Sequence, residues 1–331
     1  MNKVFFYCLQ IAVVFTLYIA PFSLLAQKAD TNNAAITLNS VRLIEQYREE
    51  ACGAVISLNF ELALEKIKKA NNLAISLQDS SGKGETILSN AQLHYYLESY
   101  DKAAKLNSTA IAQLKASQNT EKLASALSLQ GFISTKLSEF SASENYFKQA
   151  DALYSASNNE GGKSSILLGR GILEFEKRNP KVALNYLNAG VTKYREFVMS
   201  FQEASGLLYK AKALLQLEDD AKKTYLLQSK TALKNALLII EAKNYKKLKI
   251  DSYQIKANIA QKEGERIKAK TMLEEYTSKI DALKVENISL ISAINNSEPN
   301  GVEIQKEMLP TDEELSDKEK SESFNVITNG L

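Results

Sequence analysis

The chain has 331 residues, of which 45% are hydrophobic and 24% are charged, proportions that are typical of a globular protein. Its 41 Lys and Arg residues nearly balance 39 Asp and Glu residues, giving a net charge of +2. This balance argues against a nucleic-acid-binding protein, since such proteins need a strong basic field. The single histidine, His94, excludes metal sites built from several histidines.

The N-terminal segment, residues 1–26, has the layout of a secretory signal peptide. Lys3 precedes an apolar stretch over residues 4–20, and the small residue Ala26 stands before the expected cleavage point. The alternative is an uncleaved membrane segment, since the stretch nearly spans a bilayer. We expect residues 1–26 to be a signal peptide and residues 27–38 a linker. The protein is then exported to the periplasm or secreted, and it contacts a membrane only if the segment is retained.

Cys52 is the only cysteine after this segment, so the mature chain has no internal disulfide. It follows Ala51 on a predicted helix, and no His or Lys stands close by in sequence to activate its thiol. We interpret Cys52 as a small packed hydrophobe rather than a reactive group.

The chain repeats itself with a fixed period between about residues 40 and 200. Four positions in each repeat unit keep the same kind of side chain from unit to unit. The first position holds a small residue, the second a residue with a ring, and the third and fourth small residues. They are Ala51, Ala91, Gly131 and Gly171; Phe60, Tyr100, Phe140 and Pro180; Ala63, Ala103, Ser143 and Ala183; and Ala70, Ala110, Ala150 and Gly190. A period of about 40 residues indicates a repeat architecture, in which each unit buries its apolar face against its neighbours.

The spacing within a unit is helical. Phe140, Ser143, Phe147 and Ala150 follow one another in steps of three and four, which places them on one helix face. Each unit is expected to be two helices of about four turns joined by a short loop, as at residues 137–139. Polar segments at 79–82, 118–120 and 158–162 are expected to be turns between units. The Gly82-Lys83-Gly84 sequence lies in one of these turns and is too short for a phosphate-binding loop.

These units resemble the tetratricopeptide repeat. Small residues near the middle of the first helix, a ring that opens the second helix and the spacing of Ala63, Ile67 and Ala70 match the pattern of that family. The second unit departs from the pattern at Asn107, where a large apolar residue is expected. The usual period of the family is about 34 residues, so the resemblance is to a longer variant found in exported bacterial proteins and signalling scaffolds. It implies an all-α fold, a right-handed α-solenoid of stacked antiparallel helix pairs over residues 39–296.

The regularity weakens after Lys193. A helix over residues 225–242 has its small residues about nine positions late, and a long last helix is expected over about 264–295. We interpret this helix as a cap on the end of the solenoid. The alternative is a dimerising seam, in which a polar residue at Asn287 fixes the register. The seam positions are Leu273, Tyr276, Ile280, Leu283, Asn287, Leu290 and Ile294.

The last segment, residues 297–331, loses helical periodicity and turns acidic. It holds nine Asp and Glu residues against three Lys residues, a local charge of −6. We expect a disordered, solvated tail. Binding to a basic partner and occupation of the protein's own groove are the alternatives.

No catalytic, metal or cofactor site is expected. His94 stands beside Tyr95 and Tyr96 on a first helix, and neither an orienting carboxylate nor a nucleophile can be assigned to it. Asp and Glu residues on the solvent faces of helices normally serve solubility.

The family resemblance implies that the first helix of each unit lines a concave groove. The family's groove-facing positions fall here on Arg48, Gln92, Tyr95, Tyr96, Ser128, Phe132, Lys136, Phe175, Tyr209, Lys212, Gln254 and Asn258. Rings, amides and a few cations suit an extended peptide or a helix. The clamp for C-terminal carboxylates used by some family members is not reproduced, since Leu88 and Ser128 stand where polar clamp residues are needed.

The sequence thus predicts a non-enzymatic, exported scaffold that binds a protein or peptide partner in its groove. The alternative is a sensory input module that dimerises through its last helix and signals to a membrane kinase or transporter. A third hypothesis, carbohydrate capture, is disfavoured because the chain has no Trp to stack on a sugar ring.

Overall fold

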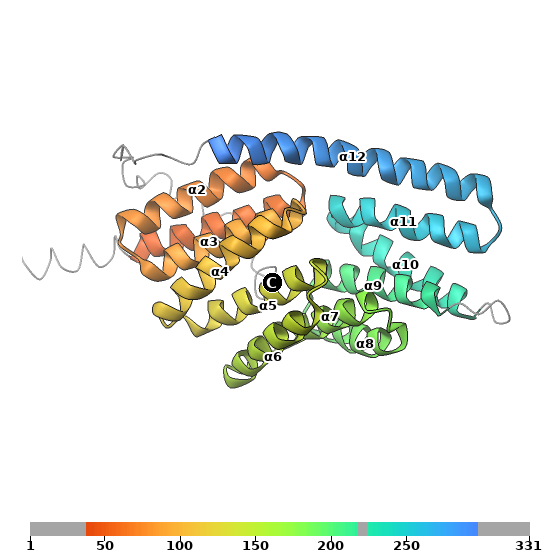
Figure 1. Ribbon diagram of the computed structural model, residues 1–331, viewed down its shortest axis with the longest axis horizontal. Helices are drawn as coiled ribbons and strands as arrows, with labels where there is room; N and C mark the ends of the chain where they lie inside the picture. The colour runs from red at the N-terminus through yellow and green to blue at the C-terminus, as the bar shows by residue number, and fades with distance from the viewer. Residues whose placement is uncertain (1–37, 218–223, 297–331) are drawn as a thin grey trace, which may run out of the picture.

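The computed structural model describes residues 38–217 and 224–296, and these residues are helical apart from short turns. A first helix covers 38–56. It is followed by α2 (Phe60–Ser76), α3 (Ser80–Tyr96), α4 (Tyr100–Ala116), α5 (Thr120–Lys136), α6 (Phe140–Ala156), α7 (Glu160–Glu176), α8 (Pro180–Glu196), α9 (Ser200–Gln216), α10 (Thr224–Lys243), α11 (Lys246–Lys262) and α12 (Arg266–Asn296). The predicted all-α solenoid of stacked helix pairs is therefore confirmed (Figure 1).

Each repeat of the sequence corresponds to two consecutive helices. Helices α2 to α9 begin at even intervals, from Phe60 to Ser200, and each sequence period covers two of them. The four ring residues of the repeat are the first residues of the second helices, namely Phe60, Tyr100, Phe140 and Pro180. Each helix packs closely on its neighbours in the chain, so the units bury their apolar faces against one another as the period predicted.

The turns between these helices share one backbone geometry. After α8, for example, the amide of Met199 donates to the carbonyl of Tyr194 at 2.8 Å, and Val198 has a φ of 58°. This is the Schellman arrangement, which closes a helix through a residue in the left-handed region. The residues in this conformation are Leu58, Gln78, Glu98, Gln118, Ser138, Asn158, Arg178, Val198 and Asn244, together with Gly264.

Replacing Val198 by Gly should stabilise the protein by about 1 kcal/mol, since a β-branched residue is disfavoured at positive φ. Val198 is 66% exposed, so little packing is lost. Urea unfolding followed by circular dichroism measures the change in unfolding free energy. Ser138→Gly is the matched control, because an unbranched residue at the same kind of turn should gain less. An equal or smaller gain for Val198→Gly than for Ser138→Gly would contradict this account of the turns.

One prediction about the turns is wrong. Gly82, Gly84 and the pair at residues 161–162 lie in the first turns of α3 and α7, not in loops. The reason is close packing: a Cβ on Gly162 would lie 2.3 Å from Cδ1 of Tyr154 on α6. Gly162 therefore lets the start of α7 approach the end of α6, and Gly84 lets the start of α3 approach Leu114 at the end of α4.

The solenoid curves so strongly that distant units meet. Phe201 at the start of α9 contacts Tyr96 at the end of α3, with ring centroids 6.3 Å apart, and it contacts Tyr245 at 5.2 Å. The amine of Lys247 lies 3.2 Å from the carboxylate of Glu98, a residue 149 positions earlier in the chain. An extended solenoid has contacts only between neighbouring units, so these contacts close one side of the curve.

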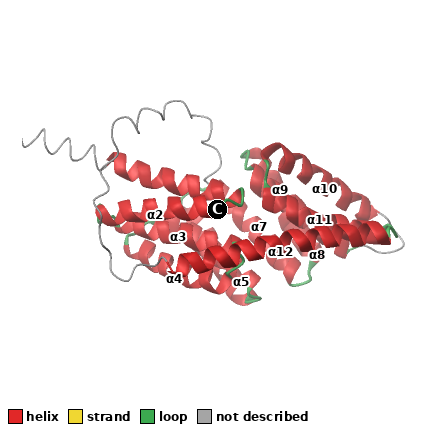
Figure 2. Ribbon diagram, turned by 90° about the horizontal axis from the view of Figure 1, so that it is seen from above, coloured by secondary structure: helices red, strands yellow, loops and turns green. Residues whose placement is uncertain are grey.

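The last helices continue the stack with a shifted register. The predicted late helix is α10, and the predicted long helix is α12, which packs along α11. Helix α12 runs back across the molecule towards α2–α4 (Figures 1 and 2). Ile280 is buried, whereas Leu273 is 49% exposed, so α11 covers only part of the apolar face. The side chains of Leu283, Asn287, Leu290 and Ile294 lie outside the described residues, as do the predicted signal peptide (1–26), residues 27–37 of the predicted linker and the predicted tail (297–331). Residue 38, the last of the predicted linker, begins the first helix.

Candidate interaction groove

The first helices of the units bring several predicted groove residues together. The amine of Lys136 on α5 donates to the hydroxyl of Tyr209 on α9 at 3.0 Å, and it lies 3.3 Å from the carboxylate of Glu176 on α7. The ring of Tyr209 packs edge-on against Phe175, with centroids 5.8 Å apart. The inner surface is therefore built from α5, α7 and α9, which are the first helices of three successive units.

The same contacts stabilise the charged form of the Lys136 amine. The Tyr209 hydroxyl and the Glu176 carboxylate raise the pKa of the Lys136 amine above its ordinary value, although burial opposes this shift. Lys136 is therefore permanently protonated and holds the inner surface together. Cys52 is equally inert, since burial raises the pKa of its thiol to about 11.

The other predicted residues lie elsewhere on the inner helices. Tyr95 packs against Tyr96 and Tyr100 at 5.5 and 5.7 Å, so its ring is committed to the protein. Phe132 is 8% exposed and packs on Phe147 in the core. Arg48 is paired with Glu85, Gln92 is half-buried on α3, and Ser128 is buried on α5. None of these residues lines the pocket between α7, α9 and α11.

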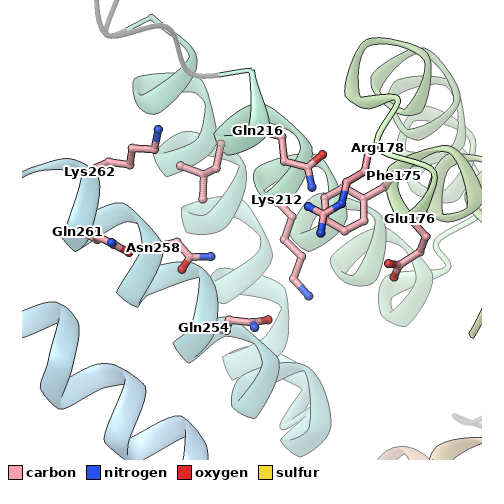
Figure 3. A pocket seen from close by; sticks show the side chains of 10 residues that line it. Phe175, Glu176, Arg178, Lys212, Gln216, Gln254, Asn258, Gln261 and Lys262 are labelled. Atoms are coloured by element: carbon pink, nitrogen blue, oxygen red, sulfur yellow. The ribbon is translucent and has the colours of Figure 1, made fainter.

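The groove is hollow between α7, α9 and α11, where a pocket of about 770 Å³ opens. This volume lies within the range of ligand-binding pockets in proteins. Figure 3 shows side chains from all three helices projecting into the shared space. The lining residues are Phe175, Glu176, Arg178, Lys212, Leu215, Gln216, Gln254, Asn258, Gln261 and Lys262. Four of them, Phe175, Lys212, Gln254 and Asn258, are among the predicted groove residues.

The pocket carries three cations that have no carboxylate partner among the residues that the structure describes. Arg178, Lys212 and Lys262 form no ion pair with any residue that the structure describes, and the amine of Lys212 instead lies 5.1 Å from the centroid of the Tyr209 ring. The lining carboxylate, that of Glu176, is already paired with Lys136. Three positive charges therefore line the pocket without a carboxylate partner among the described residues.

The lining also offers hydrogen bonds and apolar contact. Gln216, Gln254, Asn258 and Gln261 supply amide groups, each of which can both donate and accept a hydrogen bond. Phe175 and Leu215 supply apolar surface. Cations, amides and apolar side chains on adjacent helices suit an extended peptide that carries carboxylates.

Sequence reasoning missed several pocket residues that the period could have found. Glu176 and Gln216 stand one and two repeat periods after Lys136, on the same face of equivalent helices. Helix α11 begins at Lys246, later than a strict period counted from Ser200 of α9 would place it. Lys262 follows Gln216 by the same number of residues as the start of α11, Lys246, follows the start of α9, Ser200. Counting with this longer interval in place of the regular period would have identified Lys262.

Two further kinds of feature were sought among the described residues, a cluster of metal-ligating side chains and a membrane-spanning helix. Within residues 38–217 and 224–296 there is no group of three or more His, Cys, Asp or Glu side chains that could hold a metal ion. No described helix is both long enough and apolar enough to cross a bilayer.

Comparison with known proteins yields structural neighbours only. No protein-family model and no curated protein sequence matches the chain. The crystal structure of BtubC (BKLC) from P. vanneervenii is 14% identical, covers 77% of this chain and 98% of its own, and has a TM-score of 0.47. The signal transduction ATPase with numerous domains PH0952 from Pyrococcus horikoshii, which has a tetratricopeptide repeat sensor, is 15% identical with a TM-score of 0.46. That match covers 74% of this chain and 38% of the ATPase.

Proposed function

We propose that this protein is a non-enzymatic scaffold that binds an extended, carboxylate-bearing segment of a partner protein in the pocket between α7, α9 and α11. The observation that carries the proposal is a pocket lined by four amides and by three cations, Arg178, Lys212 and Lys262, that pair with no described carboxylate. Each cation forms charge-assisted hydrogen bonds with a carboxylate, and the amides satisfy the backbone of an extended chain. The signal-peptide layout of residues 1–26 supports a place in the bacterial envelope.

Reversing two of the pocket charges should abolish partner capture. With Arg178→Glu and Lys212→Glu together, like charges face the carboxylates of the partner, and we expect the amount captured from native envelope extracts to fall about tenfold or more. Affinity purification followed by mass spectrometry measures the loss. The matched control is Lys148→Glu with Lys234→Glu, which changes the net charge equally at exposed positions on α6 and α10. Equal losses for both variants, or no loss for the pocket variant, would remove the groove assignment.

A second candidate function is a dimeric sensory module. It is favoured by exposed apolar residues on α12, where Ile267 is 86% and Val285 is 66% exposed. A partner helix would cover such side chains. Sedimentation of the mature chain distinguishes the two candidates, since the sensory module requires a dimer that Val285→Asp weakens. A monomer at all concentrations would remove it.

A further inference from the structure

The basic pocket has a candidate occupant within the same chain. The segment after α12, residues 297–331, carries a charge of −6. Its acidic residues are densest around Asp312, Glu313 and Glu314, which stand next to one another. The pocket presents three cations that pair with no described carboxylate, so the two parts have complementary charges.

Chain length allows the segment to reach the pocket. The pocket residue Lys262 ends α11, and α12 begins at Arg266 beside it. Helix α12 has 31 residues, so its far end lies about 46 Å away along the helix axis. The chain from Asn296 to Glu313 spans about 56 Å when fully extended. The acidic cluster can therefore return along α12 to the pocket, whereas Glu298 and Glu303 cannot, because they are tethered by about 23 Å of chain at most.

We propose that the acidic segment around Glu313 and Glu314 occupies the α7/α9/α11 pocket and competes there with the partner. This inference rests on the proposed function, since it requires the pocket to bind peptide. The tether from Asn296 to Glu313 has a relaxed length of about 23 Å and must stretch to about twice that length, so the segment acts at a local concentration of about 0.1 mM. An attraction with a dissociation constant of about 10 μM then keeps the pocket largely filled. A partner must then displace the segment, and the protein binds partners more weakly than its open pocket would.

The test uses full-length mature chains and a fluorescent synthetic peptide of residues 308–324 as the probe. Neutralising the distal cluster with Glu313→Gln and Glu314→Gln should raise the affinity for the peptide about tenfold over wild type, because the internal competitor is weakened. The matched control, Glu298→Gln with Glu303→Gln, removes the same charge where the chain is too short to reach, so its affinity should equal that of wild type. Adding Arg178→Glu and Lys212→Glu to the distal variant should abolish peptide binding.

Equal affinity in wild type, distal variant and control would overturn the inference, and so would an absence of peptide binding to any of the chains. Partner capture from extracts, measured separately with the pocket variant, would still stand in both cases. Failure of this inference is thus distinguishable from failure of the proposed function. An affinity that rises equally in the distal variant and the control would show a general charge effect and would also overturn it.

Discussion

Replacing Phe147 by Ala is expected to lower the unfolding free energy by about 3–5 kcal/mol. The Phe147 side chain is fully buried and packs edge-on against Phe132, with ring centroids 5.3 Å apart. Its ring also fills the space that side chains at two glycines would need. A Cβ on Gly131 or on Gly169 would lie 2.5 Å from a carbon of this ring. Removing the ring leaves a cavity between α5, α6 and α7 that the helices cannot close without moving.

Urea unfolding measured by circular dichroism gives the loss, and Phe197→Ala is the matched control. Phe197 is 38% exposed, so its truncation should cost less than about 1 kcal/mol. A double-mutant cycle sharpens the test, since Gly169→Ala should be destabilising next to Phe147 but better tolerated with Phe147→Leu. Similar losses for Phe147→Ala and Phe197→Ala would contradict the packing described here.

Lowering the pH should destabilise the protein through His94. This side chain is fully buried, and neither ring nitrogen has a hydrogen-bond partner among the described residues. Burial lowers the pKa of His94 to about 4, with a smaller effect from the positive charge of Lys102. The unfolded chain binds a proton near its ordinary pKa of about 6.5. Stability from this group is therefore complete above about pH 6.5 and is lost as the pH falls towards 4, by about 3 kcal/mol in total.

The contribution of His94 is isolated by comparing wild type with His94→Leu. Carboxylates titrate in the same range in both proteins, so the difference between their urea unfolding free energies at pH 7 and pH 4 reports on the histidine. We expect wild type to lose about 2–3 kcal/mol more than His94→Leu over this interval. If the unfolding free energies of wild type and His94→Leu change equally with pH, the folded protein does not hold His94 in its neutral form, and this account is wrong.

The repeat itself was predictable from the sequence. The ring residues Phe60, Tyr100, Phe140 and Pro180 begin helices as predicted, because a residue at a fixed place in each unit fills the same gap between helices. Phe175, Lys212 and Asn258, which the resemblance to the tetratricopeptide repeat places on inner helices, line the pocket between α7, α9 and α11. Their role in binding a partner stays a prediction.

Contacts across the curve were not predictable. Phe201 meets Tyr96 only because small rotations between successive units add up over several helices. No residue pattern in the sequence gives the size of these rotations. The position of the pocket depends on the same curvature, and on the shift that begins α11 at Lys246.

Single residues also depart from the pattern for reasons that require coordinates. Asn107 occupies a core position where the family pattern expects a large apolar residue. It is fully buried and donates to the carbonyl of Ala126 at 2.8 Å and to the Gln130 side chain at 2.9 Å. A hydrogen-bonded amide thus replaces apolar packing at this site. The glycines at the start of α3 and α7 resemble turn residues in the sequence, since close helix approach and a turn both call for glycine.

In the proposed function, a partner segment lies in the pocket between α7, α9 and α11. Site-specific photo-crosslinking tests it most directly, with a photoreactive amino acid placed at Gln254 inside the pocket or at Lys234 on the exposed side of α10. In extracts of the native cells, we expect the Gln254 position to form a covalent adduct with a partner and the Lys234 position to form none. Adducts from Lys234 with none from Gln254 would contradict the account.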